Sequence, residues 1–265
     1  MRICVAIPLH NAESWLADLS LNPEYDYRFF DNASTDATRE ILESRGFAFV
    51  SSSQLLARPD SWIQAYKFAC ETDTDWIKPL FAGDSLASGL SKIEISDPEV
   101  GIILLSYKVS VRENVARTAR KWNITGDLAR DISIYGPFVG PPIAMMFSKS
   151  AILNAEQELL KSYSEWLADF QIFEALAQKS KYIFIEKVAG IFHSSKRRTF
   201  IKLSKNVSYF AQEMQLMIRY RKQIEPVTTF DKLRITKRIV DLGLHRLPNP
   251  RALGIILINV LNVWR

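Results

Sequence analysis

The sequence passes from an apolar run to a helical pattern through the stretch Phe29-Phe30-Asp31-Asn32-Ala33-Ser34-Thr35-Asp36-Ala37-Thr38. Residues 27–30 have the aromatic content of a buried strand. Residues 39–46 follow a helical pattern that ends in Gly46, a residue suited to a helix C-cap. A strand that leads through short polar residues into a helix is typical of α/β folds.

The polar residues at this junction predict a ligand site. Ser34 or Thr35 can cap the helix, and Asp36 is expected in its first turn, where the helix dipole favours negative charge. Asp31 and Asn32 then have no such structural task, and we expect them to face a partner. Open α/β sheets bind their ligands at the carboxyl ends of strands, so the junction predicts a site there.

Strands and helices alternate along the N-terminal part of the chain. Strand-like runs occupy residues 2–9, 47–51, 76–81 and 100–111, and helical patterns occupy residues 12–19 and 61–71. This alternation predicts βαβ units with right-handed connections and a mainly parallel sheet through about residue 110. No element is predicted within the polar residues 112–135. Farther on we expect a strand over 143–148, a helix over 165–178, short strands over 182–185 and 188–192, and helices from residue 206.

Size and cysteine content indicate the class of protein. A chain of 265 residues suits one large domain, or one domain with an appendage. Cys4 and Cys70 lie in core-like patterns and are too few for a disulfide framework, which favours a reducing cytosol. Residues 3–9 are too short for a secretory signal, and no run reaches the roughly 20 apolar residues of a membrane-spanning helix. We therefore expect a cytoplasmic protein.

Charge is distributed unevenly along the chain. Residues 1–186 carry 18 Lys and Arg against 25 Asp and Glu, a net charge of −7. Residues 187–265 carry 16 against 4, a net charge of +12. Such a basic tail can attract a membrane surface, a nucleic acid or a phosphorylated substrate.

Polar residues follow two further strands of the predicted sheet. The turn Ile7-Pro8-Leu9-His10-Asn11-Ala12-Glu13 opens a helix, and Asn11 there can be either a ligand contact or a plain helix cap. Residues 76–81 run into Gly83 and Asp84. Mg²⁺ and Mn²⁺ prefer oxygen ligands and often use one or two carboxylates with substrate phosphates, so Asp84 is a candidate metal ligand. The alternative is a turn in which Asp84 caps a following helix.

Two candidate residues lie in the second half of the chain. Asp169 is flanked by large apolar residues and can act as a general base for a substrate hydroxyl, or it can be a solvated helix residue, as can Glu165 one turn earlier. His193 follows the last short strand and can bind a metal or a phosphate, although a lone histidine often does neither. The basic residues 196–198 come directly after it.

The order of these motifs resembles that of a family 2 glycosyltransferase of the GT-A fold. The resemblance rests on Ile7-Pro8-x-x-Asn11-x-Glu13, the block from Asp31 to Thr38, Trp76-Ile77-Lys78-Pro79-Leu80-Phe81-x-x-Asp84, and then Asp169 and His193. Residues 61–66 and 139–147 also resemble family members. It covers about residues 3 to 200. It implies an α/β, Rossmann-like, mainly parallel central sheet flanked by helices.

The resemblance implies an inverting, hexosyltransferase-type enzyme that moves a sugar from a nucleotide-sugar, such as a UDP-sugar, to an acceptor hydroxyl. The acceptor would be a glycan or a lipid-linked molecule, in the synthesis of cell-surface polysaccharide or glycan. By similarity, Asp169 is the catalytic base, and Asp84 and His193 hold Mn²⁺ or Mg²⁺ against the diphosphate. The residues that bind the donor would be Pro8, Asn11, Glu13, Asp31, Asn32 and Ser34.

The chain departs from the family pattern in two places. Gly83 stands where an aspartate is common, which predicts a weaker metal affinity. Around His193 the register can shift by two residues, which would give Ser195 or Arg197 the functional position.

Three other functions agree with the sequence only in part. A non-catalytic nucleotide-sugar-binding protein would have a decayed metal motif at Gly83. A nucleotidyltransferase needs a glycine-rich basic loop after the first strand, but residues 8–13 contain neither glycine nor lysine. Nucleic-acid binding by the tail is disfavoured by the acidic N-terminal part.

We accordingly expect a GT-A domain over residues 1–204 and a helical basic extension over residues 205–265. Lys232, Arg234, Lys237 and Arg238 precede an apolar run over residues 253–264 that is too short to span a bilayer. This run can lie on the inner face of the cell membrane beside anionic lipid, which would make the protein a peripheral membrane protein. It can equally dock on the protein itself or on another subunit of an oligomer.

Overall fold

The structure of the chain is a computed structural model that describes residues 1–111, 114–118, 124–135, 139–159, 167–193, 207–223, 229–244 and 250–264. The chain forms two compact units. The first consists of Met1–Lys121 and Val139–Lys196, and the second of Trp122–Phe138 and Arg197–Arg265. Each unit is described by itself.

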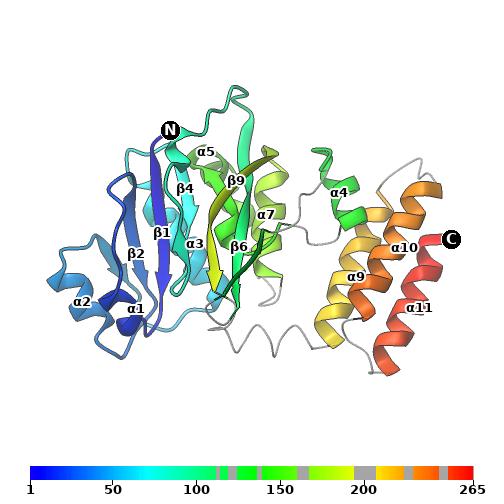
Figure 1. The fold of residues 1–265 in the computed structure, drawn as a ribbon, viewed down its shortest axis with the longest axis horizontal. Coiled ribbons are helices and arrows are strands. Elements are labelled where there is room, and N and C mark those ends of the chain that lie inside the picture. The colour runs from blue at the N-terminus through cyan, green and yellow to red at the C-terminus, as the bar shows by residue number, and fades with distance from the viewer. Residues whose placement is uncertain are drawn as a thin grey trace. The chain divides into compact units, whose positions relative to one another are not determined.

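The first unit is built on one mixed sheet of nine strands (Figure 1). Its parallel half contains, in spatial order, β3 (Phe49–Ser51), β2 (Asp26–Asp31), β1 (Ile3–Leu9) and β4 (Trp76–Pro79). β8 (Met145–Ser148) then lies antiparallel between β4 and β6 (Val100–Val111). The sheet is completed by β9 (Lys181–His193), parallel to β6, by β5 (Ser85–Leu86), antiparallel to β9, and by β7 (Asn114–Thr118), antiparallel to β6.

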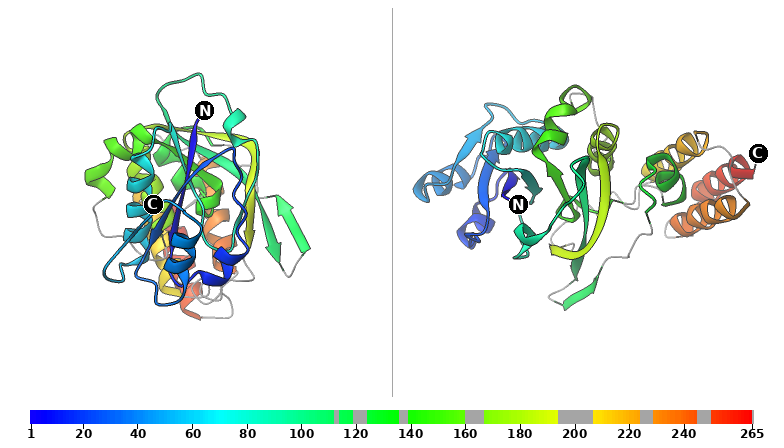
Figure 2. Two further views of the ribbon diagram at one scale, coloured as in Figure 1. Left: turned by 90° about the vertical axis from the view of Figure 1, so that its left-hand side faces the viewer. Right: turned by 90° about the horizontal axis from the view of Figure 1, so that it is seen from above.

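Helices cover both faces of the sheet. On one face α3 (Arg58–Cys70) packs on β1, β2 and β4, while α5 (Lys149–Asn154) and α7 (Ala168–Ala177) pack beside it, and Figure 2 (right) shows these helices together on one side. The short α6 (Glu156–Leu159) contacts α7. On the other face the core includes Leu16 of α1 (Glu13–Ala17), Leu42 of α2 (Thr38–Ser44) and Leu90 of the 3₁₀ turn Leu90–Lys92. A second 3₁₀ turn, Pro142–Ala144, leads into β8.

β1 lies at the centre of the first unit because its side chains suit burial on both faces. Its sequence ICVAIPL is almost entirely apolar, which is typical of a parallel strand covered on both sides. Cys4 is fully buried there, and burial raises the pKa of its thiol to about 12. Cys70 is also a buried free thiol.

The topology brings the carboxyl ends of several strands to one edge of the sheet. β1, β2, β3 and β4 are parallel, and β6 and β9 run in the same direction because the antiparallel β8 separates them from β4. The chain passes from β1 to β2 and β3 on one side, and then crosses to β4 on the other side of β1. The crevice outside the ends of β1 and β4 is therefore the topological switch point, where such sheets bind ligands.

The second unit is a bundle of helices. α9 (Val207–Arg221), α10 (Thr229–Leu244) and α11 (Pro250–Trp264) pack together, and α4 (Leu128–Tyr135) packs on α9 and α10. Its core contains Ile134, Met214, Met217, Ile235, Ile239 and Val263. Within the parts of the chain described here, no helix is long and apolar enough to cross a membrane.

The structure confirms the predicted α/β fold class, and the described residues beyond 206 include the helices α9, α10 and α11. Gly46 lies just beyond the end of α2 with φ of +64°, as a glycine at a helix C-terminus should. The two short strands predicted over 182–185 and 188–192 were wrong, because they form the single strand β9. The pairing of β9 with β6 continues across a register irregularity between Leu105 and Ser106, which holds the two halves in one strand.

Candidate functional site

The loops that follow β1 and β2 are bound to each other through backbone N–H groups. The N–H groups of Asn11, Ala12 and Glu13 donate to side-chain oxygens of the second loop. The three acceptors are Ser34 Oγ at 2.9 Å, Thr38 Oγ1 at 2.8 Å and Asp36 Oδ2 at 3.2 Å, in that order. The start of α1 is thus capped by side chains from the other loop.

The second loop is bound by the first in the same way. Thr35 N donates to Asn11 Oδ1 at 2.8 Å, and Ala37 N donates to Glu13 Oε2 at 2.9 Å. Asn11 has a φ of +51°, which asparagine tolerates better than most residues. The two loops therefore form one rigid edge.

These contacts correct the capping predictions. Asn11 does not cap α1, because Ala12 occupies the N-cap and makes no side-chain cap. Ser34 and Thr35 do not cap α2, which begins at Thr38 after Ala37. Asp36 lies ahead of the first turn and not within it, but its carboxylate accepts from Thr38 N at 3.1 Å. These polar side chains accept hydrogen bonds from backbone N–H groups of the neighbouring loop. Such long-range pairing is not evident from the local sequence.

Asp31 has a structural task that the sequence did not reveal. Its side chain is fully buried and forms an ion pair with Arg39 Nε, while Asp31 Oδ1 accepts from Ser34 N at 3.1 Å. Arg39 also donates to the main-chain oxygen of Ser52 at 3.1 Å, which ties in the loop after β3. Burial acts to raise the pKa of Asp31, but hydrogen bonds from Ser34 and Arg39 outweigh it and lower the pKa. The prediction that Asp31 is left without a structural partner was wrong.

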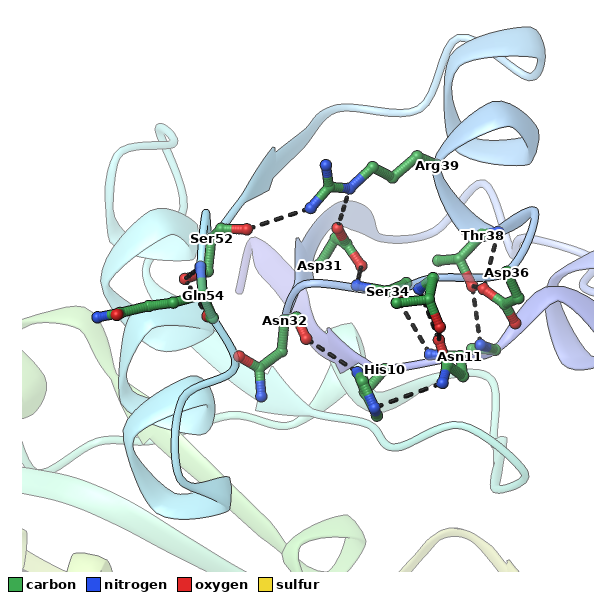
Figure 3. Close-up of polar contacts among 12 residues, drawn as sticks. His10, Asn11, Asp31, Asn32, Ser34, Asp36, Thr38, Arg39, Ser52 and Gln54 are labelled. Carbon is green, nitrogen blue, oxygen red and sulfur yellow. Dashed lines mark hydrogen bonds and ion pairs between the residues drawn. The ribbon is translucent and has the colours of Figure 1, made fainter.

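Asn32 and His10 organise the centre of this edge (Figure 3). Asn32 Oδ1 accepts from Leu56 N at 2.8 Å and Asn32 Nδ2 donates to Leu56 O at 3.0 Å, so the amide holds the loop before α3. The sequence suggested that Asn32 faces a partner, but its amide is already bonded to Leu56. His10 Nδ1 lies 2.9 Å from Asn32 O, and because a carbonyl only accepts, Nδ1 carries the proton. Pro8 is half-buried in β1 opposite Phe30, and the imidazole of His10 is exposed.

The structure brings Asp84 and His193 together at the same edge. Asp84 follows β4 and is buried, His193 ends β9, and His193 N donates to Asp84 Oδ1 at 3.2 Å. His193 Nε2 lies 3.2 Å from Ser85 Oγ. β5 holds this pair, because Ser85 pairs with Ile191 of β9. Residues 108 positions apart in the sequence thus form one polar cluster.

The turn before Asp84 explains the glycine that departs from the family pattern. Gly83 has a φ of +94°, a conformation that an aspartate adopts only with strain. Asp84 is followed by β5, so the alternative in which it caps a helix was wrong.

The two side chains fit a divalent cation only in part. Carboxylate oxygen and imidazole nitrogen are both ligands for Mn²⁺, and such sites often add substrate phosphates and water. Among the residues that the structure describes, no group of three or more His, Cys, Asp or Glu could hold a metal ion by itself. Asp84 and His193 would therefore need a diphosphate to complete the coordination.

Lys78 lies fully buried in β4 beneath this cluster. Its ammonium group donates to Ile143 O and, at 3.0 Å, to Met145 O, where β8 diverges from β4. Burial lowers the pKa of Lys78 to about 7, although the negative charge of Asp84 acts in the opposite direction. This lysine was not singled out from the sequence, where it reads as one polar residue in a strand.

Asp169 lies in the first turn of α7, half buried. Burial raises the pKa of Tyr66 in α3 well above its ordinary value, and the nearby charge of Asp169 adds to the effect. Asp169 therefore lies on the α3 side of the sheet. Other candidates, namely Glu165, Ser195, Lys196, Arg197 and Arg198, lie outside the described residues.

Solved structures match this architecture over most of the chain. Staphylococcus aureus TarS in complex with UDP-GlcNAc is 14% identical, with a TM-score of 0.61 over 99% of this chain and 82% of that chain. The chain has the GT-A fold. A mannosyltransferase from Pyrobaculum calidifontis in complex with GDP-Man and Mn²⁺ is 14% identical, with a TM-score of 0.55 over 97% of this chain and 73% of that chain. No protein-family model and no curated protein matches the sequence.

The sequence analysis did not identify the residues that hold the loops at this edge of the sheet together. Arg39 carried a signal, because it lies in the first turn of the helix that follows Asp31 and can reach back to the strand end. The contact of Asn32 with Leu56 carried none, because it depends on how β3 and its loop pack beside β2.

Proposed function

We propose that this protein is an inverting glycosyltransferase that transfers a hexose from a UDP-sugar to an acceptor hydroxyl with the help of a divalent metal. The observation that carries the proposal is the meeting of Asp84 and His193 at the carboxyl edge of a GT-A sheet. The related folds were solved with UDP-GlcNAc and with GDP-Man and Mn²⁺. The contacts within the chain at this edge support a binding site for a nucleotide-sugar.

The donor would lie across the loops after β1, β2 and β4. Asn11 and Glu13 are exposed at the switch point and are held rigidly by their bonds to Thr35 and Ala37. Asp31 and Asn32 are buried, so we assign them to shaping the edge through Arg39 and Leu56. A rigid edge favours catalysis because little ordering remains to be done when the donor binds.

The leaving diphosphate would lie against Asp84 and His193. A cation bound there supplies charge neutralisation for the leaving group. Asp84 is fixed by the N–H of His193, and β5 fixes that segment to β9, so the two groups keep their positions as the donor binds.

The acceptor hydroxyl would be deprotonated by Asp169. An inverting displacement needs a base on the face opposite the leaving group, and we assign this base to Asp169, in the first turn of α7. Tyr66, kept protonated by its raised pKa, adds no competing negative charge beside Asp169. The acceptor would be a glycan or lipid-linked molecule of a cell-surface polymer.

A thermal-shift and hydrolysis screen of nucleotide-sugars with and without Mn²⁺ tests the proposal. We expect at least one UDP-sugar to raise the melting temperature, and Mn²⁺ to increase that shift. If no nucleotide-sugar stabilises the protein, the proposal fails. Stabilisation without hydrolysis or transfer, across a broad acceptor panel, would instead favour a non-catalytic nucleotide-sugar-binding protein.

The conformation of Gly83 weighs against that alternative. A decayed metal motif would leave glycine in a turn that another residue could occupy equally well. Here φ of +94° requires glycine, so the missing aspartate follows from the shape of the turn.

A further inference from the structure

Helix α11 is apolar on two opposite sides. Its inner side packs in the core of the helical unit through Ile255, Ile256, Val260 and Val263. On the outer side Leu257, Ile258 and Leu261 are 63%, 61% and 54% exposed. Residues at these spacings share one helix face, so the exposed side chains form a continuous apolar stripe. Leu233, on the adjacent α10, is also 53% exposed.

This concentration of exposed apolar groups is local. Of the seven large hydrophobic side chains that are exposed within the described residues, four belong to α10 and α11. Single exposed leucines need no explanation, but a stripe indicates a surface that is covered by something.

The exposed charge of the helical unit is mainly positive. In its described part the acidic side chains of Asp131, Glu213 and Asp231 are buried, and that of Asp127 is exposed. The exposed basic side chains are Arg130, Arg219, Lys222, Arg234 and Lys237. Arg234 and Lys237 lie on α10, the helix that contacts α11 and carries Leu233. The surface therefore combines apolar and cationic groups.

The dimensions of α11 suit a helix that lies on a bilayer. Its 15 residues extend about 22 Å at 1.5 Å per residue, less than the roughly 30 Å of a hydrocarbon core. Asn259 donates its side-chain N–H to Ile255 O at 2.7 Å, so its amide is partnered within the helix and needs less water.

We propose that α10 and α11 form a docking surface for a membrane that contains anionic lipid. The stripe would enter the boundary between head groups and acyl chains, while Arg234 and Lys237 lie against the lipid phosphates. Charge complementarity selects this occupant over a second copy of the chain, because two such cationic surfaces repel each other. The inference is independent of the proposed reaction.

Vesicle flotation of the full chain tests the surface. The probes are vesicles of phosphatidylcholine alone and of phosphatidylcholine mixed with phosphatidylglycerol. We expect flotation only with the anionic vesicles, and weaker flotation at high salt. Leu257→Asp should lower the partition coefficient about tenfold or more, because it removes an apolar anchor and adds a repelled charge. Lys237→Glu should lower it about tenfold without changing the apolar stripe.

Matched controls come from the first unit. Leu55 is 62% exposed, so Leu55→Asp makes the same change at equal exposure, and Lys92→Glu is the corresponding charge control. Both controls should float like the unchanged protein. Lack of flotation on anionic vesicles, or equal losses in Leu257→Asp and Leu55→Asp, would overturn the proposal.

Light scattering tests whether the stripe is instead covered by a second copy of the chain. If the protein is a dimer that Leu257→Asp dissociates, and the dimer does not float, the stripe is a contact between copies and the proposal is wrong. If Leu257→Asp fails to fold, as judged by circular dichroism, Lys237→Glu against Lys92→Glu decides the matter.

Discussion

We expect the free energy of unfolding to increase as pH rises just above neutrality, and we expect the replacement of Lys78 with methionine to remove this increase. Lys78 titrates at about 7 in the folded protein, against 10.5 for an ordinary lysine, because burial disfavours its charge. Between these values the unfolded chain binds the extra proton, so the free energy of unfolding increases as pH rises. The increase is at most about 1.4 kcal/mol per pH unit, or roughly 2 kcal/mol from pH ~7 to pH ~8.5.

The upper end of this window is set by the buried thiols. Burial raises the pKa of Cys4 to about 12 and that of Cys70 to about 11, so above an ordinary thiol pKa of 9.0 they reduce stability as pH rises. Below pH ~9 the titration of Lys78 has the opposite effect and increases stability as pH rises. The methionine variant retains the apolar stem but leaves Ile143 O and Met145 O without the ammonium donor, so we expect lower stability and no slope from this group.

Urea denaturation followed by tryptophan fluorescence measures the effect. The unchanged protein and Lys78→Met are compared across the window, and the difference between their unfolding free energies is plotted against pH. A difference that does not vary with pH would refute the assignment, because it would mean that Lys78 keeps an ordinary pKa in the folded state.

Four further substitutions test the site and its support. Asp169→Asn should abolish sugar transfer while leaving donor affinity nearly intact, and a loss of donor binding in calorimetry would contradict its role as acceptor base. Asp84→Asn should weaken both donor binding and transfer, measured with and without Mn²⁺; unchanged values would exclude it from the diphosphate site. Gly190→Ala should destabilise the protein by about 3 kcal/mol, because a Cβ there would lie 2.1 Å from the main-chain oxygen of Ser85. Gly254→Ala, at an open helix position, should stabilise it by about 1 kcal/mol in the same denaturation assay.

The sequence predicted those elements whose pattern is local. β1 and α3 follow from apolar runs and helical spacing, and the end of α2 follows from Gly46. The parallel direction of β1 to β4 also follows, because βαβ connections join parallel strands, but the order of these strands in the sheet was not predicted. The insertion of β8 between β4 and β6 depends on long-range pairing that no local pattern records.

The candidate site shows the same division. The strand ends that carry Asp84 and His193 could be predicted, and the fold brings these residues together. The role of Asn32 could not be predicted, because its partner lies on the loop before α3. The ion pair of Asp31 with Arg39 of α2 had a local signal in the sequence, but that signal alone does not exclude a ligand contact. Polar residues at a strand end can bind a ligand or brace a loop, and only the packing of neighbouring elements distinguishes the two.

Calorimetric titration of UDP-sugars tests the central claim, a nucleotide-sugar site at the edge where Asp84 and His193 meet. The unchanged protein, Asp84→Asn and the surface control Leu153→Asp, on the exposed side of α5, are each titrated with and without Mn²⁺. We predict that at least one UDP-sugar binds the unchanged protein and Leu153→Asp more tightly with Mn²⁺, and that Asp84→Asn loses this enhancement. Absence of binding by every UDP-sugar, or the same Mn²⁺ dependence in Asp84→Asn, would contradict the claim.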